Sequence, residues 1–574
     1  MKGFKAIFGA RDKLDGTERD PASTEAAAIW RQYLRGQDYL DKFNIRKRTE
    51  DCYRFYEGDQ WTYRGQSLET GGGPYPIYNI IEPTINLKVA TVAMNNMGIS
   101  FSPQGVLSLE ERQSALEACA ALEQHIRLLW ENFFLDQALW QYALTAAITG
   151  FAPVYFDADG APEAVDGTNI FFGDEQEGDL QRQPYIIIRE RRAVTELRQL
   201  AADSGLSEDE AALILPDSET QEQLGDMAKE EVKSQEQDGK CTSLLKLWRD
   251  EDGTVCFCRS TQQVVFQPAQ RIEGLQLYPL AAMVWKKRKG SARGRGEVEE
   301  MIPNQVEVNK NLARRIFAAK SSAFPRLVYD GQAIDHPEAL SMVGAPIEVV
   351  GSARQVEDMI QYLQPQPISN DVRELSEELI SRTQELHQAG DAALGSINPE
   401  QASGAAIVAA KNQAEIPLNW QKQAFKQLVE DIGRIWYALT VAYNPNGLEV
   451  YGEDEHGLPQ YHAISGEQLE SLRVNIRVDV SSVNPVSKLA TEQALENLLQ
   501  GGAISFEEYV DLLDEGSNVP KAKLQDMLKK RQPVMAGPGA GPVGGQPEAQ
   551  TLPAQGPVRQ EVDQDMLMAM LGAG

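Results

Sequence analysis

The densest group of chemically useful side chains in this 574-residue sequence is a short basic stretch. Within positions 286–295 lie six bases: Lys286, Lys287, Arg288, Lys289, Arg293 and Arg295. Flexible ammonium and guanidinium groups of this kind suit contact with the phosphate backbone of a nucleic acid. The glycines at 290, 294 and 296 do not match a nucleotide-binding loop, and no G-K-[ST] is present. The stretch is compatible with a solvated loop or with a phosphate-contacting segment that guides DNA.

A second group of charges lies on two long helical patterns that follow this stretch. Lys310 and Arg314 are spaced by four and therefore share one face of the first pattern. We interpret them as ion-pair partners for acids of a neighbouring copy, in preference to DNA contacts; those acids are Glu297, Glu300 and Glu307. The second pattern carries five acids against two bases between 371 and 385, so complementary charge is available across a subunit boundary.

Catalytic and metal-binding residues do not occur at recognisable spacings. None of the five histidines has a nucleophile and an acid partner in a known motif, and H-E-x-x-H and G-x-S-x-G are missing from the sequence. Five scattered cysteines predict reduced thiols, and Cys256 and Cys258 lack the second ligand pair of a zinc site. His456 follows an acidic run between two strand patterns, which favours a hydrated hairpin turn. We expect no catalytic residue, no metal and no cofactor.

Length and charge narrow the class of protein further. A chain of 574 residues is expected to form several domains. No apolar run is long enough to span a membrane, and the first ten residues lack the apolar core of a signal peptide. We therefore expect a cytosolic protein or one that is assembled in a cytosol. The net charge of −29 argues against a broad grip on nucleic acid. It is compatible with a wall past which DNA slides, or simply with solubility.

The elements that position these charges follow from hydrophobic periodicity and turn residues. Helices are predicted from a cap at Ser23 or Thr24 toward Tyr56, and at 79–97, 109–148, 193–202, 297–322, 371–388 and 405–443. Strands are predicted at 99–103, 153–157, 169–172, 185–189, 242–249, 254–266, 278–285, 448–451 and 472–480. The segment 207–238 holds eleven acids against two lysines and is expected to be a solvated insertion.

Two of these helices, 297–322 and 371–388, enclose a strand-forming insert at 325–366. Neither pattern shows the broad apolar face of an ordinary core helix, so the pair is expected to stack against copies of itself in a ring or tube. Strand-rich segments flank this helical excursion on both sides. The simplest topology is one α/β domain whose chain leaves, builds a protruding shaft with a tip, and returns to complete the same sheet.

At this point the sequence resembles the portal proteins of tailed bacteriophages, the head–tail connector family. The resemblance is carried by Tyr56-Glu-Gly-Asp-Gln-Trp61, by Tyr78-Asn-Ile-Ile-Glu-Pro83-Thr-Ile-Asn86, by 296–311, and by 395–411 with its Ser403-Gly404. The order and spacing of these motifs cover about residues 25 to 530. The aromatic turn Y-x-G-x-Q-W is most similar to portals of short-tailed phages.

The resemblance implies a predominantly helical α+β portal fold. Its parts would be an arm (1–24), an α/β wing (25–295), stem helices (296–324 and 368–389), a small α/β clip (325–367), a tunnel loop (390–404), a tunnel helix (405–446), returning wing strands (447–482), a helical crown (483–531) and a flexible tail (532–574). A long C-terminal helical barrel, present in some relatives, has no counterpart in this sequence.

The implied function is a DNA channel at one capsid vertex of the virion, used for packaging, retention and ejection. The implied partners are a homo-oligomeric ring of twelve subunits, double-stranded DNA, the terminase large subunit, head–tail adaptors, and capsid or scaffolding proteins, with no membrane. The tunnel loop would present Asp391, Asn398, Glu400 and Gln401 to the duplex. The clip would present Tyr329, Asp330, Asp335 and His336 to terminase and then to adaptors. The alternative from another class is a large acidic nucleic-acid-processing hydrolase with an unrecognised site.

Overall fold

The computed structural model describes residues 24–64, 66–68, 74–93, 96–104, 109–217, 239–323, 326–329, 338, 360–363, 370–387, 416–453, 459–481, 495, 499, 501 and 504–512. Helices and strands are both abundant, as the predicted α+β class requires. The chain forms two compact units, 1–488 and 489–574, and the first unit holds nearly all the described elements.

Two helices open the described chain. Helix α1 (Glu25–Lys42) begins where the Thr24 hydroxyl accepts the backbone N–H of Ala27 at 3.2 Å. It does not continue toward Tyr56, because Asn44 adopts a left-handed conformation (φ +53°) that ends the helical path before α2 (Ile45–Glu57). Gly58 (φ +94°) ends α2 at the predicted turn. The short strands β1 (Thr62–Tyr63) and β2 (Gln66–Ser67) pair next, followed by α3 (Ile81–Ala93).

A five-stranded antiparallel sheet has the order β10-β9-β8-β7-β6. Its strands are β6 (Ile170–Phe172), β7 (Tyr185–Ala193), β8 (Lys240–Arg249), β9 (Val255–Ser260) and β10 (Val265–Arg271). The predicted strand 254–266 is therefore wrong in one respect, because the chain reverses after Ser260 and forms two strands. Side chains of α1, among them Trp30 and Tyr33, pack with Phe171 and Ile187 of this sheet. The short helices α6 (Val194–Asp203) and α7 (Glu208–Ala212) form a smaller cluster with β10.

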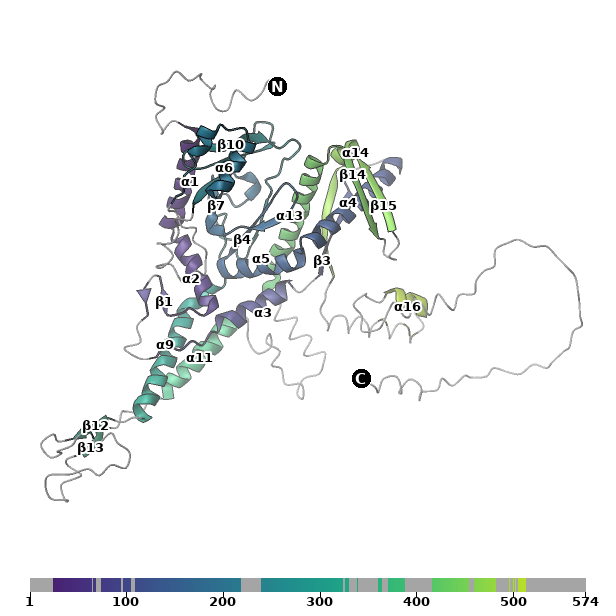
Figure 1. The fold of residues 1–574 in the computed structure, drawn as a ribbon. Helices are drawn as coiled ribbons and strands as arrows, with labels where there is room; N and C mark the ends of the chain where they lie inside the picture. The colour runs from purple at the N-terminus through teal and green to yellow at the C-terminus, as the bar shows by residue number, and fades with distance from the viewer. Residues whose placement is uncertain are drawn as a thin grey trace, which may run out of the picture. The chain divides into compact units, whose positions relative to one another are not determined.

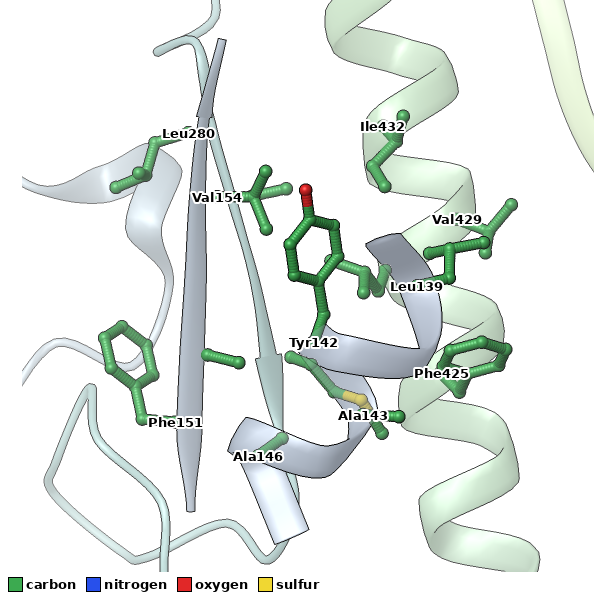
Figure 2. Close-up of a cluster of buried hydrophobic side chains, with 14 of the residues drawn as sticks. Leu139, Tyr142, Ala143, Ala146, Phe151, Val154, Leu280, Phe425, Val429 and Ile432 are labelled. Carbon is green, nitrogen blue, oxygen red and sulfur yellow. The ribbon is translucent and has the colours of Figure 1, made fainter. Parts of the chain in front are cut away.

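The main core surrounds α5 (Leu135–Thr149). A three-stranded sheet of β11 (Leu280–Val284), β4 (Phe151–Phe156) and β5 (Pro162–Ala164) lies on one side, and the long helix α13 (Asn419–Tyr443) lies on the other (Figure 2). Figure 2 shows Leu139 and Tyr142 of α5 between Val154 and Val429. The predicted helix 109–148 is broken into α4 (Leu109–Asn132) and α5, because Phe134 has a left-handed backbone (φ +49°).

The two predicted shaft helices are α9 (Val298–Ala323) and α11 (Asn370–Leu386), which lie side by side (Figure 1). Between them in the chain, β12 (Arg326–Tyr329) pairs antiparallel with β13 (Ile360–Leu363), as the strand-forming insert predicted. One expectation is wrong. The first half of α9 does have a core face, because Met301, Ile302 and Val306 are buried in the main core.

The chain returns through a short turn (Ile416–Leu418) and α13, and then through β14 (Gly447–Glu453), β15 (Pro459–Ser465), α14 (Gly466–Ser471) and β16 (Val474–Ser481). The returning strands do not complete the earlier sheet. Instead β14 pairs with β15, and β16 pairs with β3 (Asn96–Pro103). The physical reason is that α13 packs against β11, whereas β14 and β15 pack against α4.

The second unit has one described helix, α16 (Phe506–Leu512), in which Val510 is buried. Several expectations lie outside the described residues: the arm up to residue 23, most of the acidic insertion (218–238), the tunnel loop, the start of the tunnel helix (405–415), most of the clip and crown, and the tail.

Candidate functional site

The basic stretch 286–295 is a folded loop against the start of α9. Its ends meet in an antiparallel bridge between Lys286 and Arg295, with the Arg295 N–H donating to the Lys286 carbonyl at 2.9 Å. The glycines allow backbone to approach backbone. A Cβ on Gly296 would meet the carbonyl oxygen of Ile148 at 2.2 Å, and one on Gly294 would meet that of Gly150 at 2.4 Å. Gly294 and Gly296 are thus explained by close packing on the end of α5.

Three bases of this loop, Lys286, Arg288 and Arg295, are paired with acids in the first turn of α9. Glu299 is shared by Arg48 of α2, Arg288 and Arg295, all within 3.4 Å. Glu300 is bound by Lys286 at 3.1 Å and by Arg295 at 2.7 Å. Acids in the first turn also face the positive end of the helix dipole. The loop therefore holds the start of α9 in place.

Glu297, the residue before α9, is the centre of a buried charge cluster. Its carboxylate accepts the indole N–H of Trp285 at 3.0 Å and lies 3.0 Å from the ammonium groups of Lys88 (α3) and Lys286. Nδ1 of His387, which directly follows α11, lies 3.1 Å from its second oxygen. The cluster therefore joins the beginning of α9, the end of α11 and α3 at one point.

Electrostatics keep this carboxyl group ionised. Burial raises the pKa of Glu297, but the bond from His387 and the charges of Lys88 and Lys286 more than offset it and hold that pKa well below its usual value. Burial lowers the pKa of Lys88, with Glu297 opposing the shift. Glu297, Glu300 and His387 lie close enough together to hold a metal ion. However, the two ammonium groups already occupy the Glu297 oxygens, so a structural ion cluster fits this site better than a metal.

Arg293 is not available to DNA. Its guanidinium forms two bonds to Glu175, at 3.0 and 3.1 Å, and donates to the Ile170 carbonyl at 2.6 Å. It also lies over the rings of Phe151 and Phe172. Both charged side chains are buried. The structure places Arg293 inside the protein, where it joins the loop to the sheet, and this corrects its assignment as a DNA-guiding residue.

Two of the predicted DNA-guiding bases have no charged partner within the part of the chain that the structure describes. Lys287 and Lys289 are exposed, and neither has a hydrogen-bond or ion-pair partner among the described residues. Lys289 lines a cavity of about 530 Å³ beside the corner between α1 and α2. Lys287 lines another of about 730 Å³ between β11 and α13. Alternate residues of the run 286–289 therefore have different environments. Lys286 and Arg288 bind acids, while Lys287 and Lys289 are exposed to solvent.

Lys310 and Arg314 share one face of α9, as their spacing predicts; Lys310 is partly exposed and Arg314 is exposed. Both find an acid in their own helix, since Glu307 lies 3.4 Å from Lys310 and 4.0 Å from Arg314. Glu297 and Glu300 are used inside the chain, so the expectation that these two acids serve a neighbouring copy is wrong. Their position at the start of a helix did not indicate that Lys88 and the basic loop would pair with them.

Besides the charge cluster around Glu297, the structure contains a cluster of buried side-chain amides that the sequence did not predict. Gln305 of α9 donates to the Tyr78 carbonyl at 2.7 Å and accepts the Ile80 N–H at 3.0 Å. Asn309 accepts the Tyr78 N–H at 3.0 Å and donates to Gln60 at 2.7 Å. Gln60 in turn donates to Asn79 at 3.0 Å. The amides come from three of the motifs quoted above, and three of the four side chains are almost fully buried: Gln60, Gln305 and Asn309.

For the clip, the structure describes only part of the predicted surface. The backbone of Tyr329 lies at the end of β12, opposite Ile360. Asp330, Asp335 and His336 lie outside the described residues, as do the tunnel-loop residues Asp391, Asn398, Glu400 and Gln401. No helix in the described ranges has the length and hydropathy that crossing a bilayer requires.

The ion pairs at the start of α9 and the bond from His387 fix how α9, α11 and α3 lie relative to one another. The sequence profile described as Phage P22-like portal protein matches residues 185–573, which is more than half of the chain. The chain therefore belongs to the P22-like family of phage portal proteins, structural components of the virion at the head–tail connector that act in genome packaging. No curated protein matches the chain at a significant level.

Proposed function

We propose that twelve copies of this chain close into a ring at one capsid vertex and form the channel for double-stranded DNA during packaging, retention and ejection. Family membership supports a ring associated with capsid and DNA. In this proposal the ring is assembled in the host cytoplasm, docks the terminase large subunit, and later binds head–tail adaptors. The alternative of a nucleic-acid-processing hydrolase is not favoured by the family.

The observation that carries this proposal is the charge distribution on the helix pair. From Glu307 to Lys320, α9 has four bases and one acid, whereas 370–387 has five acids and two bases. Among the described residues, the ion pairs of 307–320 and of 370–386 lie within each helix, as in Arg373–Glu377 at 2.9 Å, whereas His387 contacts Glu297 at the start of α9. Opposite net charges on the two helices suit α9 of one copy facing α11 of the next. A head-to-tail contact of this kind forms a ring when the rotation from one copy to the next closes, as the family's rings require.

The parts are assigned in the same proposal. The wing would span 25–295 and 447–482, the stem helices would be α9 and α11, and β12 with β13 would belong to the clip at 325–367. Residues 390–404 would be the tunnel loop, 405–446 the tunnel helix, and 483–531 the crown. Tyr329, Asp330, Asp335 and His336 would meet terminase and then adaptors. Asp391, Asn398, Glu400 and Gln401 would face the duplex.

Deletion of residues 391–401 tests the channel assignment. Rings should still form, because the buried clusters around Glu297 and Gln305 do not include this segment. Packaging or retention of the genome should be impaired, which is measured as DNA content per particle. Normal DNA content in particles carrying the deletion would remove these residues from the DNA path.

A further inference from the structure

Three large apolar side chains are exposed along one extended segment beside α9. The segment, 74–80, is here called the tyrosine segment. Tyr75, Ile77 and Tyr78 have relative exposures of 58 %, 50 % and 52 %. Single exposed apolar residues are ordinary, but a row of them at one place is typical of an interaction surface. Tyrosine is also enriched where proteins meet, because its ring buries much area at little entropic cost.

The tyrosine segment is held rigidly, although its side chains are exposed. The indole N–H of Trp61 donates to the Pro76 carbonyl at 3.2 Å, and the rings of Trp61 and Tyr75 meet edge to face, with centroids 5.1 Å apart. Gln305 and Asn309 bind the backbone of Tyr78 on both of its polar groups. Because side-chain amides occupy that backbone, it is not available for pairing with a strand of another protein. What the segment offers a partner is its fixed side chains.

A second copy of this chain is the partner that fits best, and this step rests on the proposed ring. In a ring with a rotation axis, all copies of a given residue lie at the same height along that axis. A surface of one copy can therefore contact only those surfaces of the next copy that lie at a similar height. Asn304 of α9 bonds Thr383 of α11 at 2.9 Å, and Glu297 meets His387, so the two helices are antiparallel. Asn309, which holds Tyr78, is five residues beyond Asn304, and the antiparallel position on α11 is close to residue 378.

At this level, α11 also has an exposed apolar side chain. Leu375 lies about one turn beyond residue 378, on the side toward which the segment runs from Ile80, bound by Gln305, to Tyr78, bound by Asn309. It has a relative exposure of 49 %. The helix around it carries Glu374, Glu377 and Glu378. The neighbouring part of α9 carries Lys310 and Arg314, which follow Asn309, the residue that binds the Tyr78 backbone. Apolar contact and complementary charge therefore coincide at one level of the helix pair.

We propose that the tyrosine segment of one subunit packs on the outer face of α11, around Leu375, of the next subunit. The bonds from Gln305 and Asn309 that fix this segment to α9 then have a function beyond folding. They hold its exposed side chains in position for contact with the adjacent copy. Tyr75, Ile77 and Tyr78 supply the apolar centre of the contact, and the charges of α9 and α11 surround it.

The first test replaces the three side chains together, as Tyr75→Ser, Ile77→Ser and Tyr78→Ser in the full chain. The backbone bonds to Gln305 and Asn309 remain, so the monomer should keep its melting temperature to within a few degrees. The concentration at which half the chains are assembled should rise by about tenfold or more, measured by light scattering. Tyr451→Ser, which removes a tyrosine of 71 % exposure from β14, is the matched control and should assemble normally.

These outcomes separate the inference from the proposed function. Absence of a ring in the unmodified protein would overturn the ring itself. Normal assembly of the triple variant, or equal loss in Tyr451→Ser, would overturn only the role of the tyrosine segment. Normal assembly together with loss of binding to an adaptor or terminase would assign the segment to another protein.

The second test identifies the contact by cross-linking. Ile77→Cys and Leu375→Cys are purified separately, mixed in a disassembled state, reassembled, and treated with a short bismaleimide. Native thiols should not compete, because all five are buried: Cys52, Cys119, Cys241, Cys256 and Cys258. Covalent dimers should form only in mixed rings, since a head-to-tail contact brings Ile77 to Leu375 and never to another Ile77. Dimers of equal yield in rings of one variant, or none in intact mixed rings, would contradict the proposed contact.

Discussion

At the scale of single residues, the charged side chains near the start of α9 differ in role. The sequence could not distinguish those that stabilise the fold from those that are exposed to solvent. The basic stretch was visible as a composition, but the partner of Arg293 was not, because Glu175 is more than one hundred residues away in the chain. The same holds for Lys88, which shares Glu297 with Lys286. An exposed loop that guides DNA was compatible with the sequence, and the proposal of DNA guidance is now restricted to Lys287 and Lys289. The other four bases of the stretch serve the fold.

Replacing Glu297 with glutamine should destabilise the subunit by about 3–5 kcal/mol at pH 7, because two buried or half-buried ammonium groups lose their counter-charge. The pKa of Glu297 is depressed in the folded state, so the unfolded state takes up the proton first as the pH falls. The advantage of the unmodified protein over the variant should be complete well above pH 4.5 and shrink as the pH falls below it.

Urea unfolding of dilute subunits at pH 7 and pH 4 measures this dependence, with exposed Glu374→Gln as the control, which should change little at either pH. A Glu297→Gln variant with unchanged stability at pH 7, or with a deficit that grows as the pH falls, would show that the cluster does not act as described.

Charge removal at Lys287 and Lys289 should weaken contact with DNA and leave assembly intact, because neither side chain has a described partner. The double variant Lys287→Gln and Lys289→Gln should show a lower salt dependence of DNA binding, measured by titration of rings with duplex DNA at several salt concentrations. Arg293→Gln is the contrasting variant and should unfold more easily, because Glu175 loses its buried partner. If the lysine variant fails to assemble, the two lysines are structural and the guidance role is lost.

At the scale of elements, periodicity located most helices and strands, including α9, α11 and the β12–β13 pair. The breaks were harder to predict. Asn44 and Phe134 interrupt helical patterns by taking left-handed backbone conformations, and an aromatic residue such as Phe134 gives no sequence signal for that choice. The amide cluster was also hidden, since Gln60, Asn79, Gln305 and Asn309 look like ordinary surface residues until folding brings their segments together.

The glycines of the basic loop give a test at this scale. A Cβ on Gly296 would overlap the carbonyl of Ile148, so Gly296→Ala should destabilise the subunit by about 3 kcal/mol, near the upper end of the cost of overpacking. Gly98→Ala is the matched control, because no atom lies within 4 Å of its Cβ position. Thermal unfolding of the two variants provides the comparison. Equal melting temperatures would mean that α5 and the loop are not in the close contact described.

At the scale of the whole molecule, sequence order predicted a helical excursion between strand-rich regions, and the structure confirms that order. The predicted return to the same sheet is wrong, because strand pairing depends on long-range contacts that hydrophobic alternation does not specify. Family membership was anticipated from the motifs, and those at 56–61, 78–86 and 296–311 meet physically at the amide cluster.

The central claim is that identical subunits close around an axis, and the mass of the purified assembly tests it most directly. One chain weighs 63.6 kDa. Native mass spectrometry, supported by negative-stain images, should give a mass close to twelve times this value and annular particles with a central hole. A protein that stays monomeric or dimeric at high concentration, with no annular particles under any condition, would contradict the account.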